Sequence, residues 1–207
     1  MQSGAEGQEL MKRNFQGFKF QLLGYDGAVK VIVFQLYAFA QAPDDQGLRL
    51  TGRVRRAGGR LHLCYRLEGA RAHLMVAPPD DVPQRRHELW KTTCLEAFLR
   101  PAGSHGYWEL NLSPAGHWNL YRFDAYRQGM REESAISKID ISMKREADRI
   151  DLGAEVDLNA LGIGSGGVCI GLSAVTCTPA GHLDYWALAH PGNKPDFHHP
   201  KSFILEL

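Results

Sequence analysis

"YWELNLSPAGHWNLYRFDAYRQG", Tyr107 to Gly129, is the stretch that decides the fold. At its centre, Pro114-Ala115-Gly116 suits a three-residue hairpin loop, in which a type I turn is closed by a glycine with left-handed backbone angles. On both sides of the loop, apolar and polar side chains alternate as they do on a half-buried strand. The stretch therefore predicts two antiparallel strands, at 106–113 and 117–124.

The length of the loop determines which residues face each other across the hairpin. The expected pairs are Leu112 with Trp118, Asn111 with Asn119, Leu110 with Leu120, Glu109 with Tyr121 and Trp108 with Arg122. One face is then mainly apolar and belongs to the core. The other face carries a carboxylate, two amides and a phenol. A shift of one residue would mix the two sets, which favours this register.

The polar face differs from an ordinary solvated face because its groups orient one another through hydrogen bonds. The strand expected at 93–100 adds Glu96, on the same side as Cys94 and Phe98. Such a face would hold a hydroxyl-rich ligand, with an aromatic ring stacked on the ligand's apolar side. The alternative is a satisfied structural network buried under a covering loop.

Short alternating stretches separated by turn residues continue through most of the chain. Gly58-Gly59, between "LRLTGRVRRAG" and "GRLHLCYRLEG", predicts a second hairpin. Further strands are expected at 71–77, 86–91, 93–100, 137–145, 148–157, 167–178, 183–189 and 202–206. Glu155–Gly164 has room for one helical turn. This pattern predicts an all-β fold, an antiparallel β-sandwich with little helix.

The 207 residues have room for one ordinary domain. Residues 1–28 show no sustained period, and we expect either a tail, which would be disordered, or an over-long start of the sequence. Residues 29–207 are expected to form a single β domain, with Val31–Ala42 as its first strand. That strand resembles a signal sequence, but Gln35 interrupts it and Glu6 and Glu9 precede it. A cytoplasmic protein is the expectation.

Composition narrows the classes of partner. Charged residues make up 23% and hydrophobic residues 44%, which is typical of a globular protein, and the formal net charge is +1. This near-balance argues against a nucleic-acid partner. No apolar run is long enough for a membrane-spanning helix, so no membrane partner is expected. The four cysteines form no CxxC pair and are expected to be buried free thiols, with a disulfide as the alternative because their number is even.

Two stretches resemble the bacterial DOMON-like domain proteins: "ELWKTTCLEAFLRPAGSHGYWELNLSPAGHWNLYRFDAYRQGM" (Glu88 to Met130) and "YWALAHPGNKPDFHHPKSF" (Tyr185 to Phe203). Those proteins are similar to family 9 carbohydrate-binding modules and to haem- or sugar-binding DOMON domains. The resemblance covers about residues 31–207. It implies a β-sandwich of that type, without catalytic activity, that binds a carbohydrate or a similar polar small molecule.

The resemblance and the polar face together nominate a set of ligand-binding residues. They are Glu96, Trp108, Glu109, Asn111, Trp118, Asn119, Tyr121, Arg122, His190, Lys194, Asp196 and His198. The C-terminal members are expected to close over the hairpin. Family 9 modules hold sugars between two tryptophans, and Trp90, Trp118 and Trp186 are the candidates here. Replacing Asn111 with Leu would abolish binding if the face holds a ligand, and would unfold the protein if the face is structural.

Haem binding is the first alternative function. DOMON cytochromes use an axial Met and His, and Met75 with His73 or His190 would supply such a pair in a b-type site. Met75 and His73 are equally well explained as packing residues, and no CxxCH motif attaches haem covalently. We expect no other cofactor.

Catalysis and protein interaction are the remaining alternatives. Glu96 and Glu109 on neighbouring strands would be the two carboxylates of a glycosidase. The sequence contains no Gly-x-Ser-x-Gly elbow, phosphate loop or dinucleotide fingerprint. Asp196 with His190, His198 and His199 lacks a convincing metal-ligand spacing, so no metal is expected. A structural domain with an unknown protein partner stays open.

Overall fold

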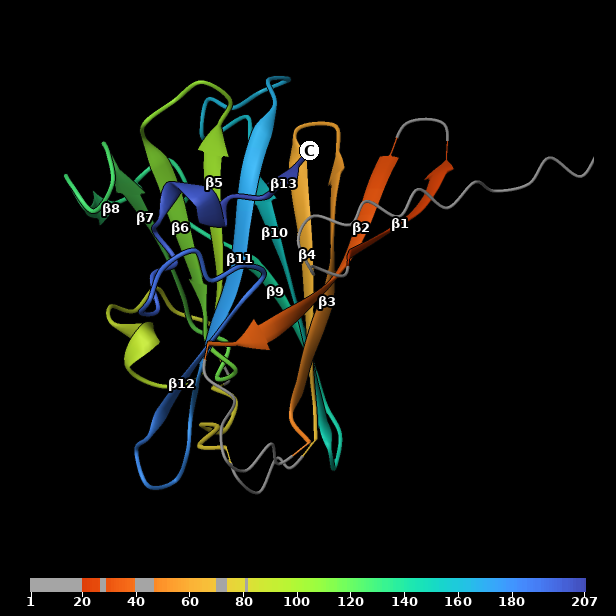
Figure 1. Cartoon of the computed structure of the whole chain (residues 1–207), viewed down its shortest axis with the longest axis vertical. Coiled ribbons are helices and arrows are strands. Elements are labelled where there is room, and N and C mark those ends of the chain that lie inside the picture. Colours follow the sequence, from red (N-terminus) through yellow and green to blue (C-terminus); the bar gives the residue numbers. More distant parts are fainter. Residues whose placement is uncertain (1–19, 27–28, 40–46, 70–73, 81) are drawn as a thin grey trace, which may run out of the picture.

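The computed structural model describes residues 20–26, 29–39, 47–69, 74–80 and 82–207, and for 20–29 only the backbone. Its regular structure is almost entirely β-strand (Figure 1). The strands are β1 (Phe20–Asp26), β2 (Val29–Ala38), β3 (Arg49–Ala57), β4 (Arg60–Glu68), β5 (Cys94–Pro101), β6 (Tyr107–Leu112), β7 (Trp118–Phe123), β8 (Arg131–Glu132), β9 (Asp140–Arg145), β10 (Arg149–Asp157), β11 (Val168–Cys177), β12 (Leu183–Ala187) and β13 (Leu205–Glu206). Two 3-10 turns are also described, η2 (Leu89–Lys91) and η3 (Pro200–Ser202).

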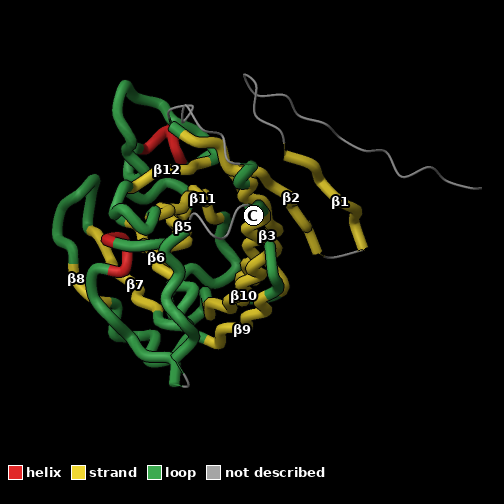
Figure 2. The backbone as a smooth tube through the Cα atoms, turned by 90° about the horizontal axis from the view of Figure 1, so that it is seen from below, coloured by secondary structure: helices red, strands yellow, loops and turns green. Residues whose placement is uncertain are grey.

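The strands form two layers joined into one curled sheet. The first layer has the order β8-β7-β6-β5-β11-β12, with β13 also paired to β11. The second has the order β2-β3-β4-β10-β9, with β1 paired to β2. Neighbouring strands are antiparallel, and β12 joins the layers by pairing with β2 at Trp186–Ala38 and Ala187–Tyr37 (Figure 2). The predicted all-β antiparallel sandwich is therefore confirmed.

The hydrophobic core lies between the two layers, because each strand turns alternate side chains inward. Leu95, Leu110 and Leu120 from the first layer belong to the same buried cluster as Leu63 and Leu152 from the second. Burying a side chain of this size contributes about 1.5–3 kcal/mol to folding. A polar contact also crosses the core. The Tyr65 hydroxyl on β4 donates to the main-chain carbonyl of Glu96 on β5, at 2.6 Å.

The predicted hairpin and its register are confirmed. Its loop is closed by hydrogen bonds from the Ser113 amide to the His117 carbonyl, 2.8 Å, and from the Gly116 amide to the Ser113 carbonyl, 2.9 Å. Gly116 has φ +94°, in the left-handed region that favours glycine. All five expected pairs between β6 and β7 occur. On the neighbouring strand β5, Glu96 lies opposite Asn111.

Other local expectations have mixed outcomes. The Gly58-Gly59 hairpin connects β3 and β4 as predicted. The strand predicted at 86–91 is wrong, because Glu88 has φ 60° and starts η2, which brings Leu89 into the interior. Residues 74–77 are not a strand either, and residues 71–73 lie outside the described ranges. The helical turn expected within 155–164 is replaced by the end of β10 followed by hydrogen-bonded turns.

The N-terminal region adds a strand that the sequence did not predict. β1 lies within the stretch expected to be a tail, and it precedes β2, the strand expected to be first. The rest of that stretch, 1–19 and 27–28, lies outside the described residues.

All four cysteines are free thiols, but only two are fully buried. Cys94 and Cys177 are buried as expected, whereas Cys64 and Cys169 are partly exposed. Within the described ranges, no helix is long and apolar enough to cross a membrane.

Candidate functional site

The polar face predicted from the hairpin lies on the outer side of the first layer, away from the core. We call this surface the outer face. It consists of the outward side chains of four strands: Cys94, Glu96 and Phe98 of β5, Tyr107, Glu109 and Asn111 of β6, Asn119, Tyr121 and Phe123 of β7, and Ser173 and Val175 of β11. Two segments pack onto it. The loop that contains η2 contributes Trp90, and the chain after β12, which we call the C-terminal segment, contributes Phe197 and Phe203. The face is thus a second interior, covered by loops.

One end of the outer face is an aromatic cluster. The rings of Tyr107 and Phe123 are stacked with 4.8 Å between centroids, and Phe203 packs edge-on against Tyr107 at 5.6 Å. Phe98 lies beside them and also contacts Phe197. Because these side chains come from β5, β6, β7 and the C-terminal segment, the cluster fixes that segment onto the sheet.

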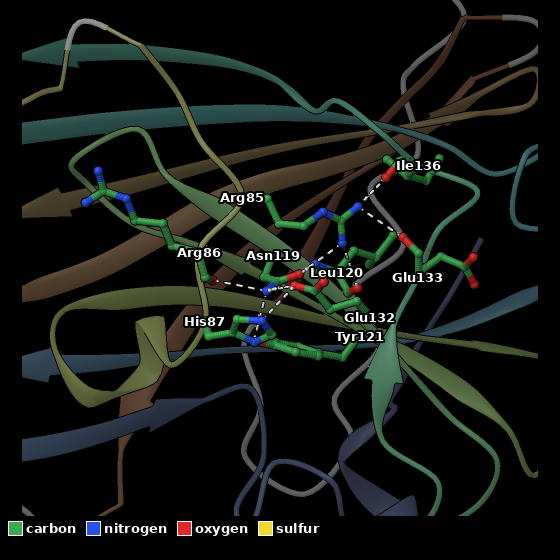
Figure 3. A network of polar contacts seen from close by, with 9 residues as sticks. All are labelled: Arg85, Arg86, His87, Asn119, Leu120, Tyr121, Glu132, Glu133 and Ile136. Atoms are coloured by element: carbon green, nitrogen blue, oxygen red, sulfur yellow. Dashed lines mark hydrogen bonds and ion pairs between the residues drawn. The ribbon is translucent and has the colours of Figure 1, made fainter.

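The opposite end is a filled hydrogen-bond network around Asn119, shown in Figure 3. The Asn119 amide nitrogen lies 2.8 Å from Glu132 Oε1, 2.9 Å from the Tyr121 hydroxyl and 3.1 Å from the Arg86 carbonyl. Its oxygen accepts from Arg85 Nη1 at 3.1 Å. The side chain is 0% exposed. We call this group the Asn119 network.

Arg85 completes the Asn119 network by reaching beneath the loop that follows β8. Its guanidinium donates to the main-chain carbonyls of Glu133, at 3.0 Å, and of Ile136. It also lies over the Trp118 ring, 4.3 Å from the centroid. With these partners in place, this end of the outer face has its polar groups occupied by the protein itself.

Between these two ends lies a pocket of about 400 Å³, a volume within the usual range for small-molecule sites. Its lining comes from five parts of the chain: Glu96 of β5, Glu109 of β6 and Phe123 of β7; Val175, Leu183 and Tyr185 of β11 and β12; Trp90 and Lys91 of η2; Arg127 and Met130 after β7; and Pro195, Phe197 and His198 of the C-terminal segment. The walls are mainly aromatic and apolar, whereas the strands contribute two carboxyl groups.

Glu96 and Glu109 are these two carboxyl groups, 3% and 5% exposed. Glu96 accepts a hydrogen bond from the Ser173 hydroxyl at 3.2 Å, and Glu109 accepts one from the Asn111 amide at 2.8 Å. Burial raises the pKa of Glu96 well above its usual value, and the charge of Glu109 raises it further. Burial raises the pKa of Glu109 to about 7, against the lowering effects of Asn111 and Arg127. The pair therefore holds protons near neutral pH.

His198 contacts Glu109 without forming an ion pair. Its Nε2 lies 3.7 Å from Glu109 Oε2, but burial and the nearby Arg127 lower the pKa of His198 to about 4. The Tyr107 hydroxyl accepts from the Arg127 amide at 3.2 Å and lies 2.8 Å from His198 Nδ1. A hydrogen bond at this distance fits a neutral imidazole, with either group as the donor.

The structure separates the predicted site residues into groups. Glu96, Glu109 and His198 line the pocket. Asn111 is 0% exposed and holds Glu109, and Asp196 lies behind the pocket wall, where it pairs with Arg127 at 2.8 Å. The others do not line the pocket. They are Asn119 and Tyr121 in the Asn119 network, Trp108 and Trp118 on the core side, exposed Arg122 over the Trp108 ring, exposed Lys194, and His190, which contacts the Tyr37 carbonyl at 2.8 Å.

Several pocket residues had no signal in the sequence. Trp90 was one of three tryptophan candidates, but Arg127 and Tyr185 belong to no pattern that marks them. Arg127 adopts φ +54°, a conformation that is uncommon for a residue with a side chain. Phe197 lies in the "KPDFH" segment and could have been found there by its place between Asp196 and His198.

The residues considered for haem or metal are placed as follows. The Met75 side chain is 42% exposed, His190 packs edge-on against Phe39 at 5.2 Å, and His73 lies outside the described ranges. In the part of the chain that the structure describes, no three His, Cys, Asp or Glu side chains are grouped to hold a metal ion.

Comparisons with known proteins identify a similar fold. No protein-family model matches the sequence, and no curated protein matches it. The structure is similar to the crystal structure of a "putative carbohydrate-binding protein" from Bacteroides uniformis ATCC 8492. The two chains share 16% sequence identity with a TM-score of 0.57, over 90% of this chain and 84% of that one. At this identity the likeness establishes the β-sandwich architecture.

Proposed function

We propose that this protein binds a carbohydrate or a similarly polar small molecule in the pocket, without catalysing a reaction on it. The observation that carries the proposal is the pair of buried carboxyl groups, Glu96 and Glu109, at an aromatic pocket of about 400 Å³. The likeness to a "putative carbohydrate-binding protein" and the resemblance to family 9 carbohydrate-binding modules also favour it.

The pocket offers the two kinds of contact that a sugar needs. A carboxyl pair that retains a proton both donates to and accepts from the hydroxyl groups of a ligand. Trp90, Tyr185 and Phe197 supply ring surface for the C–H face of a sugar. The Asn119 network, whose groups already have protein partners, serves to hold the neighbouring strand in place.

The environments of the two carboxyls favour binding over glycoside hydrolysis. A glycosidase needs one protonated acid and one ionised carboxylate, whose surroundings move their pKa values in opposite directions. Here burial raises the pKa of both Glu96 and Glu109. Both therefore resist ionisation, and Arg127, which lowers the pKa of Glu109, is itself paired with Asp196.

The test is a ligand screen with a matched pair of tryptophan variants. Purified protein is screened by thermal shift against D-glucose, D-galactose, D-mannose, D-glucosamine and N-acetyl-D-glucosamine, and isothermal titration calorimetry measures the affinity of each hit. Trp90→Ala is expected to weaken binding at least about ten-fold by removing a pocket wall. Trp186→Ala is the control, because Trp186 is also partly buried but lies on the core side, bonded to Thr176.

Two results would contradict the proposal. One is the absence of binding to any sugar in the screen by a protein that is shown to be folded. The other is equal loss of affinity in the Trp90 and Trp186 variants, because the effect would then come from general destabilisation.

A further inference from the structure

The cations of the pocket are already neutralised by carboxylates outside it. Lys91 Nζ pairs with Glu88 at 2.6 Å. Arg127 pairs with Asp196 at 2.8 Å, and that carboxylate also accepts from the Tyr126 hydroxyl at 2.6 Å. These pairs leave little positive charge to balance the interior of the pocket.

The acids of the pocket, by contrast, have no full counter-charge among the residues that the structure describes. Glu96 accepts its hydrogen bond from a hydroxyl and Glu109 from an amide, both of which are neutral donors. His198 is neutral at physiological pH because burial lowers its pKa. Arg127 lowers the pKa of Glu109, but its guanidinium also donates a hydrogen bond to the Asp196 carboxylate. Without a ligand, the two acids therefore lower their charge by taking up protons.

The walls add a second, independent preference for positive charge. Trp90, Tyr185 and Phe197 line the same pocket. The faces of aromatic rings are negative and attract cations, most strongly where water is excluded. Aromatic side chains around a pair of acids are a recurrent arrangement for holding an ammonium group.

On these grounds we infer that the ligand carries a protonated amine, so that the carbohydrate bound in this pocket is an amino sugar with a free ammonium group. The inference rests on the proposed function and narrows its ligand class. The ammonium would lie between Glu96 and Glu109 and supply the positive charge that the described residues around the pocket do not. The aromatic walls would contact both the ammonium group and the sugar ring.

Such binding has a measurable consequence for protons. The ligand enters as the ammonium ion and favours two ionised carboxylates, so the protons held by the pair are released to solvent. No covalent bond forms or breaks. A neutral sugar carries no charge that would favour the ionised carboxylates, so it would bind with little or no proton release.

The experiment compares D-glucosamine, N-acetyl-D-glucosamine and D-glucose at pH 7 by titration calorimetry on the full chain. Each titration is run in two buffers of different ionisation enthalpy, which gives the number of protons released. We expect D-glucosamine to bind at least ten-fold more tightly than either neutral sugar and to release protons. Glu109→Gln should remove that preference. Asp124→Asn, which removes an exposed carboxylate paired with Arg131 outside the pocket, should retain it.

The outcomes separate this inference from the proposed function. If a neutral sugar binds as tightly as D-glucosamine, or if binding of D-glucosamine releases no protons, the amine preference is wrong and sugar binding stands. If none of the three sugars binds, both proposals fail. The comparison of ligands on the unchanged protein decides the question even if Glu109→Gln does not fold.

Discussion

The Asn119 network and the pocket occupy the same outer face and yet differ in what completes them. Asn119 and Tyr121 lie opposite Asn111 and Glu109 in one continuous register. Over the first pair, the preceding loop supplies the Arg86 carbonyl, which accepts from Asn119, and His87, whose Nδ1 lies 3.2 Å from the Tyr121 hydroxyl. Over Glu109 and Glu96 the covering segments leave a space of about 400 Å³. Polar side chains on a sheet face therefore do not by themselves distinguish a structural network from a pocket. The difference lies in whether the covering loops fill the space above them.

The largest loss of stability should come from a substitution in the Asn119 network. Asn119→Leu removes a fully buried amide and leaves Arg85, Glu132 and the Arg86 carbonyl without that partner. We expect a loss of about 3–5 kcal/mol in the free energy of unfolding, measured by urea denaturation. Asn193→Leu, at an exposed position, is the control and should change it by less than about 0.5 kcal/mol. A loss below 1 kcal/mol for Asn119→Leu would mean that the network is dispensable.

In the pocket, Glu109→Gln should change how the free energy of unfolding depends on pH. The folded protein holds a proton on Glu109 up to about pH 7, whereas the unfolded chain releases it near 4.5. Folding stability from this group is therefore lost as the pH rises from 4.5 through 7, by about 3 kcal/mol. The stability of Glu109→Gln relative to the unchanged protein should rise by that amount across this window. Urea denaturation at a series of pH values measures it.

His198→Gln should show the opposite sign. The pKa of His198 is lowered from 6.5 to about 4, so the unfolded state binds the extra proton and stability from this group is gained as the pH rises from 4 to 6.5. Relative to the unchanged protein, the variant should lose stability across that window. If both variants gave curves parallel to that of the unchanged protein, burial would not control either group.

Asn111→Leu tests the boundary between the two halves and should have an intermediate effect. Asn111 lies beneath the pocket rather than in its lining, and its amide stabilises the Glu109 carboxylate. Its replacement should raise the pKa of Glu109 above about 7 and cost about 1–3 kcal/mol. A titration of Glu109 by NMR, together with urea denaturation, measures both quantities. An unchanged pKa would show that the hydrogen bond is not formed in solution.

The smallest change in stability should follow from opening the pocket wall. Trp90 is only partly buried, and its ring meets Tyr121 edge-on at 5.6 Å. Trp90→Ala should therefore cost about 1 kcal/mol in the free energy of unfolding, while ligand affinity falls much further. A cost above 3 kcal/mol would assign Trp90 to the scaffold and remove the contrast between the two halves.

The sequence predicted the features that depend on neighbouring residues. The loop Pro114-Ala115-Gly116 and the alternation on either side of it were enough to fix the register of the hairpin, and alternation along the preceding strand placed Glu96 on the same face as Cys94 and Phe98. It did not predict η2, because no residue type in 86–91 marks the left-handed backbone of Glu88 that precedes the buried Leu89. Nor did it predict the path of Arg85, which depends on carbonyls that lie far along the chain. Local patterns specify the strands, whereas the positions of the loops that cover the outer face depend on contacts between residues far apart in the sequence.

The hydrogen bond from Tyr65 to the main-chain carbonyl of Glu96 has a consequence for how fast different parts of the pocket move. It ties β5, the strand that carries Glu96, to the opposite layer, and we expect the amides of β5 to be among the slowest to exchange. The walls formed by η2 and the C-terminal segment lie outside the long strands, and we expect their amides to exchange faster than those of β5. Hydrogen–deuterium exchange with and without ligand would therefore report binding in the walls alone. The floor of the pocket would behave as a fixed template, and ligand entry would be governed by the motion of its roof.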